Sequence, residues 1–157
     1  MLINQPEDLS INNGSFELQW NPAFGRLTSK KLQTVQKVID NECIRLMKPY
    51  TPFRTGVLEQ SATLGTVIGS GEIRQIAPYA RYLYYGEVYG PNIPIFENGA
   101  VIGFFSPKGK GKTPTGKEIN YDTTKHQLAG KKWFERMIAD HKTDILNAAI
   151  KAIGGGV

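Results

Sequence analysis

The strongest constraint on the fold is a regular apolar stripe in the first third of the chain. Apolar residues recur at spacings of four and three from Leu32 through Val35, Ile39 and Cys43 to Leu46. This spacing places them on one face of an amphipathic α-helix. The stripe therefore predicts a long helix whose apolar face must be covered by other parts of the protein.

The ends of this helix are also marked in the sequence. Thr28 or Ser29 is the expected N-cap, because a hydroxyl there accepts a hydrogen bond from an unpaired amide of the first turn. The helix is expected to end near Met47. Pro49 and Pro52 follow it, and proline lacks the backbone donor and disfavours helix in the residue before it.

A second amphipathic helix is expected near the C-terminus, over residues 131–152. Its stripe consists of Phe134, Ile138, His141, Ile145 and Ala149. The residues that follow, 153–157, are expected to form a flexible tail.

Short strands are expected between the helices. Residues 61–76 predict two strands about the turn Gly69-Ser70-Gly71, and Asn98-Gly99 predicts a second hairpin because both central positions of a two-residue turn need positive φ. Pro78 to Tyr85 predicts a short helix closed by Gly86. Asn13-Gly14 predicts a small N-terminal hairpin, and residues 106–130 have no period and are expected to form a long flexible loop.

The predicted fold class is α+β, with a small antiparallel sheet packed against the N-terminal-half helix and the C-terminal helix. A short tyrosine-rich helix and an inserted hairpin with its loop complete it. We expect one domain over residues 1–157, since that length suffices for a core. Its parts are an arm over 1–27, a core over 28–90 and 130–152, and an insertion over 91–129.

Composition excludes several classes of protein. Cys43 is the single cysteine, so no internal disulfide is expected and a reducing compartment is favoured. No stretch approaches the roughly 20 apolar residues of a membrane span, and the N-terminus does not resemble a signal peptide. We expect a protein made in the cytoplasm with no membrane partner.

The net charge of +5 is a local feature. Four lysines, Lys108, Lys110, Lys112 and Lys117, lie in one stretch rich in glycine and proline. Such a run is either a solvated loop or a surface that lies near DNA or a neighbouring subunit.

No motif predicts catalysis. The stretch SPKGKGKT ends like a phosphate-binding loop, but Ser106 replaces a required glycine and Pro114 follows where a helix should begin. His126 and His141 are the only histidines, and Cys43 lies on the apolar stripe as a small core residue. We expect a protein that is not an enzyme, with no cofactor and no metal site.

Tyrosine is concentrated in one segment. Residues 78–90 contain Tyr79, Tyr82, Tyr84, Tyr85 and Tyr89, which are five of the seven tyrosines in the chain. A short helix cannot bury all of them, and tyrosine is enriched at protein interfaces. Two alternatives remain open: a mixture of core and surface roles, and the stacking of nucleic-acid bases, although only Arg81 is a basic residue among them.

Three separated motifs resemble the minor capsid or head-tail joining proteins of long-tailed bacteriophages. They are KPYTPFRTGVLEQSA (48–62), PYARYLYYGE (78–87) and GKKWFERMIADHK (130–142), in this order after an amphipathic helix. The resemblance covers residues 28–90 and 130–152. It implies a structural virion protein whose copies form a ring in the neck, between the head connector and the tail, with DNA passing through the centre.

The resemblance also implies partners and roles. The partners are other copies of the chain, portal or adaptor-side connector proteins, tail tube or tail terminator proteins, and genomic DNA bound without sequence specificity. The five tyrosines and Trp133 become candidates for inter-subunit contacts, and Pro52, Gly56 and Leu58 form a structural turn in which Leu58 begins the first strand. Two other functions compete with the one that the resemblance implies. One is a nucleic-acid-binding module that uses the lysines and tyrosines, and the other is a small hydrolase or nucleotide-binding enzyme.

Overall fold

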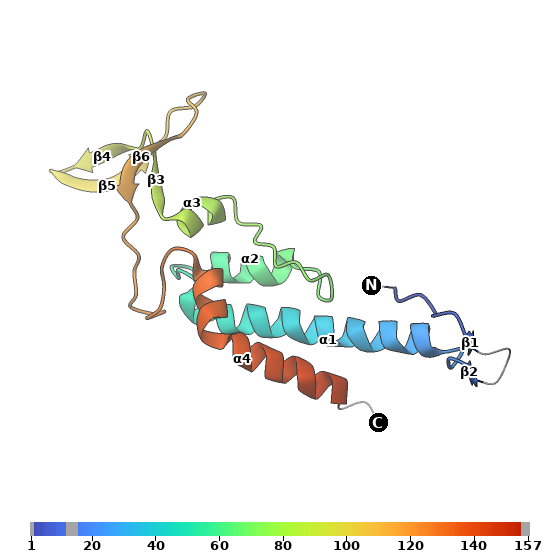
Figure 1. The fold of residues 1–157 in the computed structure, drawn as a ribbon. Helices are drawn as coiled ribbons and strands as arrows, with labels where there is room; N and C mark the ends of the chain where they lie inside the picture. The colour runs from blue at the N-terminus through green and yellow to red at the C-terminus, as the bar shows by residue number, and fades with distance from the viewer. Residues whose placement is uncertain (1, 12–15, 155–157) are drawn as a thin grey trace. The chain divides into compact units, whose positions relative to one another are not determined.

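The computed structural model describes residues 2–11 and 16–154 (Figure 1). Contacts along the chain define two compact units. Unit 1 contains the residues up to Leu46, Thr66–Ile73 and the residues from His141 onward. Unit 2 contains Met47–Gly65 and Arg74–Asp140.

Unit 1 begins with a short strand pair and a long helix. Strand β1 (Leu9–Ile11) pairs antiparallel with β2 (Phe16–Leu18), so an N-terminal hairpin is present. The predicted turn at Asn13-Gly14 lies outside the described residues. Helix α1 spans Phe24–Met47 and includes the predicted stripe, in which Val35 and Cys43 are buried.

The predicted start of α1 is wrong. Thr28 and Ser29 lie inside the helix, because α1 begins at Phe24, four residues before Thr28. Asn21 accepts just ahead of this start: the amide of Ala23 donates to Asn21 Oδ1 at 2.8 Å. The Ser29 hydroxyl donates instead to the Gly25 carbonyl at 2.7 Å. The predicted end is confirmed, since α1 stops at Met47 before a 3₁₀ turn over Lys48–Tyr50.

Residues 61–76 do not form the predicted strand pair. Val57–Gly65 is helix α2, with Leu58, Ser61 and Ala62 buried at the spacing of a helix face. Leu58 is therefore a buried helical residue and does not begin a strand. The turn at Gly69-Ser70-Gly71 exists, and its two glycines have positive φ of 99° and 76°, but a helix precedes it and chain without regular structure follows it.

The tyrosine-rich helix is confirmed as α3 (Ala80–Tyr85). Gly86 ends it in the left-handed conformation, with φ 77° and ψ 23°. Strand β3 (Glu87–Gly90) follows and pairs antiparallel with β6 (Thr113–Glu118). The prediction that residues 106–130 lack secondary structure is wrong for β6, which is polar and takes its partner from a distant part of the chain.

The inserted hairpin is confirmed. Strand β4 (Ile93–Glu97) pairs antiparallel with β5 (Ala100–Phe105) around the predicted turn, where Asn98 and Gly99 both have positive φ. The chain therefore runs from β3 through this hairpin and back to β6. We call residues 87–118 the β-arm; Figure 1 shows the hairpin beyond β3 and β6.

Helix α4 (Trp133–Gly154) closes the chain. Its most buried side chains are Trp133 and Met137, which the predicted stripe omitted, and Ile145 and Ala149, which it included. Helices and small antiparallel sheets together confirm the α+β class.

Candidate interaction surface

Tyr84 and Trp133 pack together inside unit 2. Their rings lie 4.7 Å apart at 88°, and Trp133 is only 1% exposed. The Tyr84 hydroxyl donates to the Glu135 carboxylate. Burial, and then this hydrogen bond, raise the pKa of Tyr84 well above its ordinary value. Trp133 is therefore a core residue of unit 2 and offers little surface to a partner.

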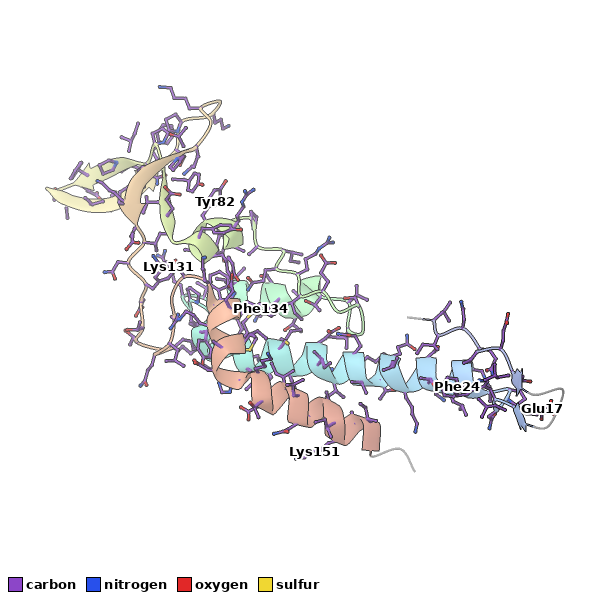
Figure 2. The ribbon with its side chains drawn as sticks, viewed as in Figure 1. Glu17, Phe24, Tyr82, Lys131, Phe134 and Lys151 are labelled. Carbon is purple, nitrogen blue, oxygen red and sulfur yellow. The ribbon has the colours of Figure 1, made fainter. Side chains whose placement is uncertain are left out.

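Other tyrosines of the segment lie at the surface. Tyr79, Tyr82 and Tyr85 are 42%, 38% and 58% exposed. The ring of Tyr82, labelled in Figure 2, lies 4.6 Å from that of half-buried Tyr89. In this segment, the ring of Tyr84 therefore anchors α3 to α4, whereas the rings of Tyr79, Tyr82 and Tyr85 remain available to a partner.

A groove of about 850 Å³ joins two of the three sequence motifs. Its lining consists of Pro52 to Leu58, Tyr79, Tyr82, Leu83 and residues 119–122. The proline turn and the tyrosine segment are thus neighbours in space although a helix separates them in sequence. A groove of this size matches the range of ordinary ligand and side-chain pockets.

Gly56 and Leu58 shape the floor of this groove. Gly56 has φ of 82°, which is the backbone conformation, costly for other residues, that the sequence predicted here. Its α-carbon faces Phe53, where an added Cβ would lie 3.3 Å from the ring. Leu58 is 4% exposed and anchors the start of α2, and Pro52 lies half-buried in the turn.

The segment after β6 forms a wall of the groove that the sequence did not predict. His126 Nδ1 lies 2.8 Å from the Thr51 carbonyl, and its Nε2 lies 3.8 Å from Glu59. The His126 and Phe53 rings are 5.0 Å apart, and Lys125 Nζ lies 3.8 Å above Phe53. These contacts fix residues 119–126 against the proline turn, although nothing periodic marks them in the sequence.

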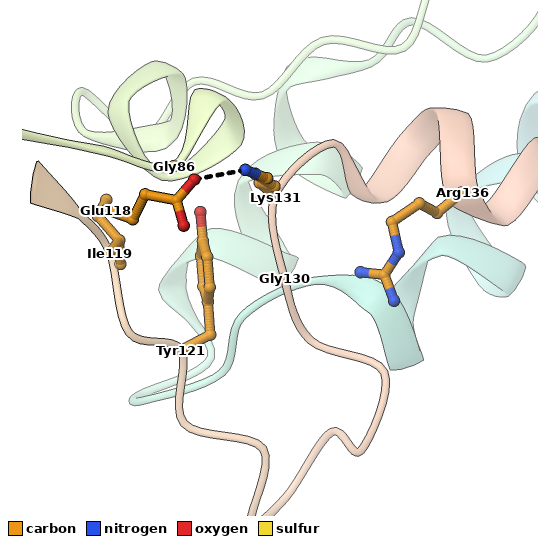
Figure 3. Close-up of a pocket in the computed structure, with 7 residues that line it drawn as sticks. All are labelled: Gly86, Glu118, Ile119, Tyr121, Gly130, Lys131 and Arg136. Carbon is orange, nitrogen blue, oxygen red and sulfur yellow. Dashed lines mark hydrogen bonds and ion pairs between the residues drawn. The ribbon is translucent and has the colours of Figure 1, made fainter. Parts of the chain in front are cut away.

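A smaller cavity of about 360 Å³ lies beside the groove (Figure 3). Lys131 donates to Glu118 at 2.8 Å across it, and this hydrogen bond lowers the pKa of Glu118. The Tyr121 hydroxyl donates to the Leu83 carbonyl, and burial raises the pKa of Tyr121. Arg136 donates to the Leu128 carbonyl at 3.0 Å, so the polar groups here hold the chain together more than they offer a site.

The four predicted lysines are all exposed. Lys108, Lys110 and Lys112 lie on the segment between β5 and β6, and Lys117 lies in β6. Lys112 Nζ donates to Asn92 Oδ1 at 2.6 Å, which ties this segment to the base of the hairpin. The lysines are therefore part of the β-arm.

The described residues contain no group of three side chains suited to a metal ion. Cys43 is buried, and burial, followed by the charge of Asp40, raises the pKa of its thiol, which makes it a poor nucleophile. His141 Nδ1 lies 2.8 Å from Asp144 on the same helix.

Comparison with known proteins leaves the family open. No protein-family model, no curated protein and no solved structure matches the chain. Within residues 2–11 and 16–154, no helix is long and apolar enough to cross a membrane.

Proposed function

We propose that this chain is a structural virion protein of a long-tailed bacteriophage, which forms a ring in the neck, joins the head connector to the tail and lets DNA pass. Residues of all three motifs that carry the resemblance to neck proteins pack against one another in unit 2. Residues 52–58 and Tyr79 line one groove, Tyr84 packs on Trp133, and Tyr50 donates to Asp140 at 2.6 Å.

The observation that carries the proposal is the uncovered apolar surface of the β4–β5 hairpin. Seven large apolar side chains there are 44–67% exposed: Ile93, Ile95, Phe96, Val101, Ile102, Phe104 and Phe105. A soluble protein rarely leaves such a patch in water unless another protein covers it. Contact between this hairpin and a neighbouring subunit would cover these apolar side chains.

The experiment is a mass measurement of the purified protein together with electron microscopy of the virion neck. A closed oligomer of defined mass, and density for the chain between head and tail, are the expected results. Absence of the chain from purified virions, as judged by peptide mass spectrometry, would overturn the proposal.

The alternative function, nucleic-acid binding, draws on the exposed lysines and tyrosines. Titration of the isolated protein with short duplex DNA at several salt concentrations distinguishes the two. Tight binding that weakens steeply with salt would favour the alternative, because each neutralised phosphate adds to the salt dependence. The ring proposal expects weak binding by a single subunit.

The lysines also test the proposal within the virion. We expect replacement of Lys108, Lys110 and Lys112 by serine to leave the subunit folded and to lower the yield of tailed particles, because these charges contact a neighbour or the DNA. A matched loss of three charges on the helices, Lys30→Gln with Lys142→Gln and Lys151→Gln, should have less effect. Normal yields of infectious virions from the loop variant would show that the loop is a passive linker.

A further inference from the structure

The β4–β5 hairpin is apolar on both faces. Paired residues of an antiparallel hairpin share a face, so Ile93 with Phe105, and Ile95 with Gly103, lie on one side. Pro94 with Phe104, and Phe96 with Val101, lie on the other. The register shift after Ile95 places Ile102 as an additional residue at a bulge.

Such a hairpin needs a partner that surrounds it. A two-stranded hairpin is marginal by itself in water, and a sheet that packs against a core on one side ordinarily has a polar second face. Here every residue of β4 is exposed, and so is every residue of β5 except half-buried Gly103. A concave surface can cover both faces of the hairpin, whereas a flat one covers only one.

The groove of unit 2 is a concave surface with matching chemistry. Val57 and Tyr79, which line it, are 49% and 42% exposed, and half-buried Phe53 adds a third apolar side chain. Aromatic and aliphatic side chains in a concavity are the usual receptor for an inserted hydrophobic anchor. The hairpin and the groove therefore both present exposed apolar side chains within one sequence.

The charges favour the same pairing. The described strands of the hairpin carry one charged side chain, Glu97, next to the turn, and the lysines begin after the opposite end of the hairpin, at Lys108. The groove carries exposed Arg54 on the proline turn and exposed Asp122 on the wall after β6. A hairpin in the groove can place Glu97 beside Arg54 and its lysines beside Asp122.

We infer that the β4–β5 hairpin of one copy packs in the groove of a second copy of this chain, with Glu97 beside Arg54. The contact joins two different surfaces, so each copy still has a free hairpin or a free groove for the next one. Repetition of such a contact generates a ring if the rotation closes. The inference rests on the proposed function only in assuming that copies associate, and it names the surfaces they use.

Cysteine cross-linking between single variants tests the inference. We would mix Phe96→Cys, at the hairpin, with Val57→Cys, in the groove, give one chain a size tag, and oxidise with diamide. Buried Cys43 stays in place, and the wild type checks that it does not react. We expect on the order of tenfold more heterodimer than in the control mixture of Phe96→Cys with Leu64→Cys, because docked thiols have a high effective concentration; Leu64 is 75% exposed and outside the groove.

Charge reversal tests the orientation. Glu97→Arg in the hairpin chain, or Arg54→Glu in the groove chain, should each lower the yield of heterodimer roughly threefold, and together they should restore it, as for an exposed ion pair. Equal cross-linking in the test and control mixtures would overturn the inference. A closed oligomer that does not form this cross-link would refute the docking but not the ring proposal. Formation of the cross-link by a chain that is absent from virions would refute only the function in the neck.

Discussion

Asp40 offers the sharpest test of how unit 1 is held together. Asp40 is only 2% exposed, although it is an acidic residue on α1. Oδ2 accepts from the amides of Gly69 at 2.7 Å and Gly71 at 3.2 Å, and Oδ1 accepts from Gln36 at 2.8 Å. The side chain therefore clamps the turn after α2 onto α1, and we expect Asp40→Ala to release it.

The size of the effect follows from these bonds. Hydrogen bonds to a charged acceptor contribute about 1.5–3 kcal/mol each. The bond to Gly71 is long, and the amides of this partly exposed turn reach water once the carboxylate is gone, so their loss is partly offset. Removal of the buried charge also removes its desolvation cost. We expect Asp40→Ala to lower the free energy of unfolding by about 2–3 kcal/mol, below the plain sum of the bonds.

Urea denaturation followed by circular dichroism measures this change. With a slope of about 1–3 kcal/mol per molar urea, the midpoint should fall by roughly 0.7–3 M. Glu42→Ala is the matched control, because Glu42 is an acid on the same helix whose partner, Arg45, is a surface residue; it should cost under about 1 kcal/mol. Equal midpoints for the two variants, with the Gly69 amide still protected from hydrogen exchange, would refute the reasoning.

Three further predictions concern unit 2. Gly56→Val should lower the melting temperature, because φ of 82° strains a β-branched residue and the new side chain meets Phe53; an unchanged melting curve would contradict this. Gly65→Ala should also destabilise the protein, because the added Cβ would lie 2.5 Å from the Arg74 carbonyl. A change from glycine to alanine in a helix usually stabilises by about 1 kcal/mol, so a higher urea midpoint would refute the close approach. The pKa of Tyr84 is raised in the folded protein, so the contribution of Tyr84 to stability is fully present below its ordinary pKa of 10. That contribution is lost as the pH rises through the pKa of the folded state. The difference in stability between wild type and Tyr84→Phe should therefore narrow above about pH 10. A gap that stays constant from pH 8 to 11 in urea titrations would contradict the last prediction.

The elements that the sequence predicted well depend on local signals. The stripe from Leu32 to Leu46 needs only its own period to specify α1, and Gly86 needs only its own freedom at positive φ to end α3. Asn98-Gly99 likewise specifies a turn by itself. Each of these signals lies within a few residues of the structure it determines, so no tertiary information is required.

The elements that the sequence did not predict depend on distant partners. The pairing of β6 with β3 joins polar residues far apart in sequence, and residues 119–126 become a groove wall only because His126 meets Thr51. The two strands predicted over residues 61–76 are absent, because α2 runs into that segment and its buried positions begin before it, at Leu58. Trp133 shows the same limit, since no sequence signal tells a buried aromatic from one that faces a neighbour.

The pairing of β3 with β6 has a consequence for how this protein can vary. Gly90 lies opposite Thr113, so the chain leaves and re-enters the body of the subunit at one place. The cost of closing a longer excursion grows only with the logarithm of its length. Residues between these two positions can therefore be lengthened, shortened or exchanged while the stem stays paired. In the proposed docking, a changed hairpin would alter the contact with a second copy while the pairing of β3 with β6 stays in place.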